Sequence, residues 1–136
     1  MGDHRDQPIS RRKARDLDIE IGFLEGLIRR DPHYVEALEL LGDGYSMRGR
    51  AEDSLAVDER LRSLKPQDPV VRFNLACSLA LSGEGERACV ELELALELGF
   101  RDFSSLRRDP DLACARKHPA FKRVRAKMKV LQLDKS

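Results

Sequence analysis

The chain has 136 residues, of which 36% are charged and 5% aromatic, with no tryptophan and a formal net charge of +1. This length fits one domain with its own core, and so few aromatic residues disfavour a β-sandwich and favour a helical scaffold. Residues 1–18 are polar and Arg-rich and no apolar run approaches the ~18 residues that span a bilayer, so we expect neither a secretory signal nor a transmembrane segment.

A polar tail over residues 1–15 precedes the first apolar residues that recur with helical spacing. The pattern predicts a first helix over residues 16–30, which stops before Pro32. A second stop follows at Pro66, 34 residues later, because a helix seldom continues into the residue before a proline. The interval between these stops indicates an internal repeat.

Between the two prolines, apolar periodicity predicts one helix over residues 35–48 and another over residues 51–64. Gly49 separates them, as expected of a residue that ends a helix. The plan then recurs, with a helix that carries Val71, Leu75 and Leu79 and stops at Gly83, and a further helix over residues 87–98.

The remaining segment predicts a shorter helix near residues 103–108, a turn at Asp109-Pro110, and a last helix over residues 119–131. Pro119 suits the first helical position, where a missing N–H is not needed. One apolar stripe follows the last helix and is expected to cap the core; it comprises Phe121, Val124, Met128 and Leu131.

A short motif recurs at the 34-residue interval, as Leu41-Gly42-x-x-Tyr45 and as Leu75-Ala76-x-x-Leu79. Together with the turn glycines and Pro66, it resembles the tetratricopeptide repeat. In that pattern the small residue lets the two helices of a pair approach closely, while the larger residues fill the space between pairs. The resemblance implies an all-α fold, a right-handed α-α superhelix of about five to seven helices.

This resemblance also divides the chain. It places tails at residues 1–15 and 132–136 around a domain at 16–131, with a half repeat at 16–34, full repeats at 35–68 and 69–100, and capping helices at 101–131. Ser54 and Asp58 stand where the family usually has alanine and an aromatic residue, so we expect looser packing on that side of the first full repeat.

No group of residues suggests catalysis, a cofactor site or a metal site. The three histidines lie in the tail and in turns without partners at triad or ligand spacing, and the glycines form no phosphate-binding loop. Cys77 and Cys89 occupy positions that normally pack, whereas Cys114, before Arg116 and Lys117, is the best candidate for a reactive thiol. The lack of a C-x-x-C pair indicates reduced cysteines, so we expect a cytoplasmic protein. Because no catalytic group of residues is recognisable, we also expect that the protein is not an enzyme.

Charge is unevenly distributed: residues 31–99 hold 7 Lys/Arg against 14 Asp/Glu, and residues 100–136 hold 11 against 4. The family resemblance implies a concave groove lined by the first helix of each pair. It would be acidic at one end and apolar at the other, unless capping helices cover it. The expected groove residues are Glu36, Glu39, Asp43, Met47, Val70, Phe73, Asn74, Cys77 and Leu81.

The basic C-terminal end is a second candidate surface, for a nucleic acid, an anionic membrane surface or an acidic protein. Aromatic residues that stack on bases are missing there, apart from Phe121 on the apolar stripe, so nucleic acid is the less favoured partner. This surface would comprise Arg116, Lys117, Lys122, Arg123, Arg125 and Lys129.

Together these features predict a non-catalytic adaptor or assembly scaffold that binds another protein in the groove. Its ligand would be a peptide or helix with apolar anchors and adjacent Lys or Arg, because such a segment complements an acidic and apolar groove. Contact between the basic end of one molecule and the acidic groove of another would give weak, salt-sensitive self-association.

Overall fold

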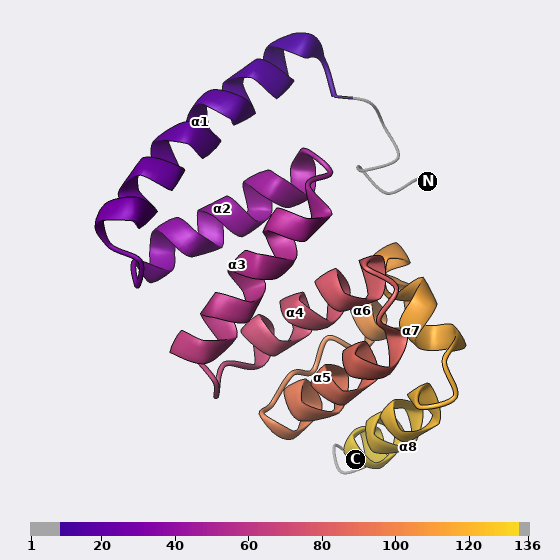
Figure 1. Ribbon diagram of the computed structural model, residues 1–136. Coiled ribbons are helices and arrows are strands. Elements are labelled where there is room, and N and C mark those ends of the chain that lie inside the picture. The colour runs from indigo at the N-terminus through magenta and orange to yellow at the C-terminus, as the bar shows by residue number, and fades with distance from the viewer. Residues whose placement is uncertain (1–8, 134–136) are drawn as a thin grey trace. The chain divides into compact units, whose positions relative to one another are not determined.

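The computed structural model describes residues 9–133, and over these residues it contains helices and turns but no β-strand (Figure 1). The predicted all-α class is therefore confirmed. Parts of the predicted tails, residues 1–8 and 134–136, lie outside the described residues. None of the helices over residues 9–133 has the length and apolar content needed to cross a membrane. The chain divides into two compact units, residues 1–64 and residues 65–136.

The first unit contains α1 (Arg11–Arg30), α2 (Val35–Met47) and α3 (Ala51–Leu64). The start of α1 corrects the predicted tail over residues 1–15, because the helix begins before residue 16. Its N-cap is Ser10, whose hydroxyl oxygen accepts a hydrogen bond from the Lys13 N–H at 3.1 Å. That bond satisfies one of the free N–H groups of the first turn and fixes the helix start there.

In this unit α2 packs against both α1 and α3. Ile21 of α1 and Leu38 of α2 are buried in the core. A Cβ atom at Gly44 would lie 3.0 Å from the Ile21 side chain, so α1 and α2 meet at a spot that favours glycine. Ser54 and Asp58 are buried on α3, so these two departures from the repeat pattern lie inside the packed face.

The second unit opens with α4 (Pro69–Leu81), whose N-cap Asp68 accepts hydrogen bonds from the backbone of Val70 and Val71. The helices that follow are α5 (Gly85–Glu97), α6 (Phe103–Arg108), the 3₁₀ turn η2 (Pro110–Leu112), α7 (Ala113–Lys117) and α8 (Phe121–Leu133). The short helix expected over residues 103–108 is confirmed. The sequence pattern missed α7, and α8 extends into the predicted tail at 132–136 while starting two residues after Pro119.

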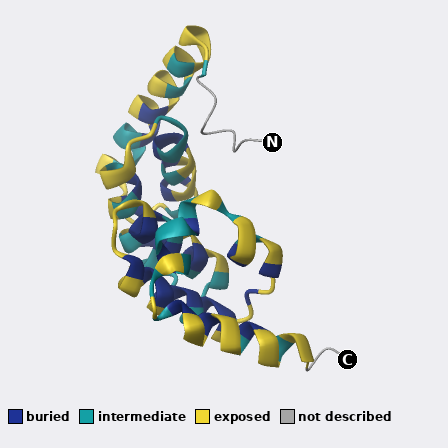
Figure 2. Ribbon diagram, turned by 90° about the vertical axis from the view of Figure 1, so that its right-hand side faces the viewer, coloured by how far each residue is buried: buried dark blue, intermediate teal, exposed yellow. Residues whose placement is uncertain are grey.

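The C-terminal elements cover the second unit as its apolar stripe suggests. Helix α5 packs against α7 and α8, and Phe121, Val124 and Met128 of α8 are buried (Figure 2). The Arg116 guanidinium donates hydrogen bonds to the carbonyl oxygens of Leu106 at 3.2 Å and Asp109 at 2.7 Å. These bonds satisfy carbonyl groups at the end of α6 and hold the turn that follows.

The 34-residue repeat is visible in the backbone. Helices α2 and α4 both have 13 residues, and their first and last residues differ in number by 34. Each ends at a glycine with positive φ, 70° at Gly49 and 81° at Gly83. In each turn the residue after the glycine donates an N–H to a carbonyl five residues earlier, at 2.8 Å from Arg50 to Tyr45 and at 2.9 Å from Glu84 to Leu79.

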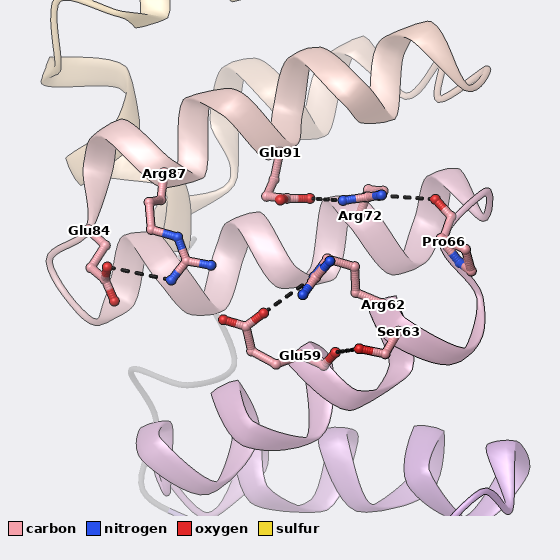
Figure 3. Close-up of polar contacts among 8 residues, drawn as sticks. All are labelled: Glu59, Arg62, Ser63, Pro66, Arg72, Glu84, Arg87 and Glu91. Atoms are coloured by element: carbon pink, nitrogen blue, oxygen red, sulfur yellow. Dashed lines mark hydrogen bonds and ion pairs between the residues drawn. The ribbon is translucent and has the colours of Figure 1, made fainter.

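The two helix pairs differ at one internal position. In the second pair, Arg72 of α4 and Glu91 of α5 form an ion pair at 2.9 Å, with side chains only 14% and 11% exposed (Figure 3). Arg72 also donates a hydrogen bond to the Pro66 carbonyl at 3.1 Å. The residues 34 positions earlier are Leu38 and Val57, an apolar pair that is buried. The same internal site is therefore ionic in one helix pair and apolar in the other.

We predict that Arg72→Leu or Glu91→Val alone lowers the free energy of unfolding by about 2–4 kcal/mol, because each leaves a largely buried charge without its partner. The double variant copies the Leu38 and Val57 pair and should lie within about 1 kcal/mol of the wild type. Urea unfolding followed by circular dichroism measures both effects. A double variant as unstable as either single one would contradict the equivalence of the two sites.

Candidate functional site

Helix α2 carries an outward-facing stripe of side chains at helical spacing. Glu36 and Asp43 are exposed and Met47 is half-buried. Burial by its neighbours raises the pKa of Asp43 from its ordinary value. Leu40, which was not predicted as a site residue, completes this stripe with a side chain that is 52% exposed. Glu39 is also exposed, but it lies beside the stripe, one residue before Leu40. Acidic and apolar residues therefore alternate along this stripe of α2, in the order Glu36, Leu40, Asp43 and Met47.

Helix α4 carries a stripe at the equivalent positions, 34 residues later. Val70 and Leu81 are exposed by 54% and 52%, Asn74 is exposed, and Cys77 is half-buried. Asn74 corresponds to Leu40, and this correspondence is the signal that would have identified Leu40. The α4 stripe is apolar at both ends and carries no charge. The two stripes belong to different units.

Phe73 corrects the predicted set, because only 8% of it is exposed. Its ring stacks on Phe100, with the ring centroids 4.4 Å apart and an interplanar angle of 10°. It corresponds to Glu39 and so lies beside the stripe rather than on it. A stacked, buried ring contributes to the core of the second unit and is not available as an anchor site for a ligand.

The first unit also contains a cleft that the sequence pattern did not predict. Its volume is about 410 Å³, and its floor is formed by α2 between α1 and α3. Glu25 and Arg29 contribute charged groups from α1, while Asp53 and Arg60 contribute charged groups from α3. The remaining lining is largely apolar: Ile28, Leu38, Leu41, Tyr45, Ala56 and Val57. The cleft arises from the packing of three helices, and local sequence patterns do not predict how helices pack.

Tyr45 lines the cleft and contacts a charged residue on either side, Glu25 of α1 and Arg50 of the turn before α3. Its hydroxyl donates a hydrogen bond to the Glu25 carboxylate at 2.5 Å, and the Arg50 guanidinium lies 4.6 Å from the centre of its ring. Arg50 in turn pairs with Asp53 at 2.8 Å. Burial first, and then the hydrogen bond and charge of Glu25, raise the pKa of Tyr45 to about 12. The phenol is thus held in its neutral, hydrogen-bonding form.

The basic C-terminal face is more constrained than its sequence suggests. Arg116 is half-buried and donates hydrogen bonds to two backbone carbonyls, which corrects its predicted place on that face. Arg123 pairs with Glu93 of α5 at 3.4 Å, and Arg125 lies over the Phe121 ring at 4.9 Å. The exposed basic side chains of this face are Lys117, Lys122, Arg123, Arg125 and Lys129.

One group of possible metal ligands occurs among the described residues. Atoms of Cys77, Asp109 and Asp111 lie within 4.8 Å of one another. The Asp109 carboxylate already accepts the Asp111 N–H at 2.9 Å as the N-cap of η2, which accounts for the approach of these two residues. Three donors of mixed hardness are one fewer than a structural zinc site uses.

The remaining histidines and cysteines show no catalytic arrangement within residues 9–133. His33 is exposed, and the His118 Nδ1 accepts the Ala120 N–H at 3.1 Å; His4 lies outside the described residues. Burial, followed by the charge of Glu93, raises the pKa of Cys89 to about 11, so this thiol resists ionisation. Cys114 is half-buried.

We predict that Tyr45→Phe removes a component of the pH dependence of stability. Because the pKa of Tyr45 is about 12 when folded and about 10 when unfolded, its contribution is present below pH 10 and is lost as the pH rises toward 12. The wild type should therefore lose about 1–2 kcal/mol more than Tyr45→Phe between pH 9 and pH 11.5. Parallel urea titrations at the two pH values measure this difference, and equal losses would contradict the hydrogen-bonded geometry.

No family model matches the chain. An 80-residue part of it is 32% identical to a protein of Arabidopsis thaliana whose name describes it as chloroplastic. The aligned part covers 57% of this chain and 24% of that protein, so the chain spans about a quarter of the length of this relative.

Proposed function

We propose that this chain is a non-catalytic protein-binding module of the tetratricopeptide-repeat type that acts as an adaptor or assembly scaffold. The observation that carries the proposal is the pair of equivalent helices, α2 and α4. Both have 13 residues, begin 34 positions apart and end in the same glycine turn. This 34-residue plan matches the length of the tetratricopeptide unit, and stacking of such units gives a right-handed superhelix.

The ligand proposed for these helices is a short helix or extended segment with apolar anchors and adjacent Lys or Arg. Glu36 and Asp43 on α2 would attract the cationic groups, while Val70 and Leu81 on α4 offer apolar surface. Burial of two or three anchors supplies about 3–6 kcal/mol before the costs of association, which corresponds to modest affinity.

The alternative is an anionic partner on the basic C-terminal face. Here the geometry is less favourable, since Arg116 is bonded to backbone carbonyls and Arg123 pairs with Glu93. Fewer cations are therefore free to contact phosphate groups than the sequence alone suggests. None of the three cysteines, all within residues 9–133, forms a disulfide, which supports the cytoplasm as the proposed compartment. The plant relative, in contrast, is named as a chloroplastic protein.

Capture of partners by the immobilised full chain from a nuclease-treated lysate tests this proposal, with mass spectrometry at low and moderate salt. The variants Glu36→Lys with Asp43→Lys, and Val70→Asp with Leu81→Asp, should each reduce capture of the same protein at least about tenfold. All four positions lie on the outward stripes, so circular dichroism should show unchanged folding. Glu52→Lys on α3 and Glu86→Lys on α5, both exposed and away from the stripes, are the matched controls.

The variant Lys122→Glu with Lys129→Glu separates the two candidate surfaces, because both residues are exposed on α8. We expect it to leave capture unchanged. Capture that survives both stripe variants but is lost with the α8 variant, or retention of nucleic acid alone in samples without nuclease, would refute the groove and favour the basic face.

A further inference from the structure

The outer face of α1 is apolar and uncovered. Ile19 and Phe23 lie one helical turn apart and are 67% and 66% exposed. The opposite face of the helix, with Ile21 and Leu24, is buried against α2. Most of the other residues of α1 are also exposed, and they are coloured yellow in Figure 2. Two large apolar side chains together on one exposed face are typical of a contact surface.

Two glycines lie on this same face, four residues apart. A Cβ atom at Gly22 would meet no atom within 4 Å, and one at Gly26 would meet only the Arg29 side chain at 3.7 Å. The packing of the chain itself therefore does not require glycine at either position, although glycine is disfavoured in a helix interior relative to alanine. Close approach by a helix from outside the chain does account for it, because a missing side chain lets two helix backbones come together.

Charged residues around this face have opposite signs at mirrored positions about Phe23. Eight positions before it stands Arg15 and eight after it Asp31; seven before it stands Asp16 and seven after it Arg30. All four are exposed. An antiparallel copy of α1 centred on Phe23 would place opposite charges together at both ends, whereas a parallel copy would place like charges together. The face is therefore complementary to itself in one orientation.

We propose that two copies of the chain associate through an antiparallel α1–α1 contact centred on Phe23. In this isologous contact Phe23 faces Phe23 of the second copy, and Ile19 faces Leu27 of the second copy. Gly22 and Gly26 give the backbones room to approach, and the mirrored charges fix the orientation. A contact between two 20-residue helices buries on the order of 1,000 Å² in total, which corresponds to a weak dimer. The contact uses neither the α2 stripe nor the α4 stripe.

Sedimentation equilibrium of the full chain from low to high micromolar concentration tests the proposal. The wild type should form a concentration-dependent dimer, and Phe23→Glu should be monomeric throughout. Asp16→Arg and Arg30→Asp should each weaken the dimer at least about fivefold, while the double variant, with the charges exchanged, should regain wild-type association. Val90→Glu on α5, a residue 50% exposed, is the matched control and should dimerise like the wild type.

Gly22→Ala separates an effect on the contact from an effect on folding. It should raise the melting temperature of the monomer by roughly 3–6 °C, because alanine is the better helix former, and yet weaken the dimer about tenfold or more. Phe23→Cys should form a disulfide-linked dimer under mild oxidation faster than Val90→Cys.

Three results would overturn the proposal: a wild type that is monomeric at high micromolar concentration, a double charge exchange that does not restore association, or equal crosslinking of the two cysteine variants. A monomeric wild type whose capture of a different protein is lost with Phe23→Glu would assign the face to that protein instead. These outcomes are independent of the α2 and α4 stripe variants, so the two proposals can fail separately.

Discussion

The glycine turn that ends the first helix of each pair fixes where the second helix of that pair begins. Gly49 and Gly83 adopt positive φ, a conformation that costs other residues free energy, and the N–H of the next residue returns to the final turn of the helix. The chain therefore reverses at a fixed residue, and the second helix starts at the same point in both pairs. In both pairs the fixed reversal sets which residues of the first helix become core and which form its exposed stripe.

Fixed register explains why one pattern can support different chemistry at equivalent sites. The internal position that holds Leu38 and Val57 in the first pair holds Arg72 and Glu91 in the second, without a change in helix length. The outward stripe likewise changes from acidic on α2 to uncharged on α4 while its spacing is kept. Because the backbone turns fix the helix positions, equivalent side chains can differ between the two pairs. They can then serve ligand binding in one pair and core packing in the other.

Local signals in the sequence were enough for most of the helices, because apolar periodicity, proline stops and turn glycines act within a few residues. These local signals failed where a residue distant in the sequence determines whether a side chain is buried. Phe73 follows a helical pattern that suits a groove, yet Phe100, 27 positions later, covers its ring. The cleft beside Tyr45 needs three helices, and the burial of Glu91 depends on Arg72. The Ser10 cap was a readable signal that was missed, since it lies in a polar segment that resembles a tail.

A weak dimer and a modest ligand site would reinforce each other. Each α2 or α4 stripe offers only a few apolar anchors, so a single contact would dissociate readily. The α1 face lies opposite the surface that packs on α2, and it shares no residue with the α2 stripe. A partner with two matching segments could then bind both copies, and its second contact would form at high effective concentration. Occupancy would in turn favour the dimer, because linkage requires that a ligand preferring the paired state stabilises that state.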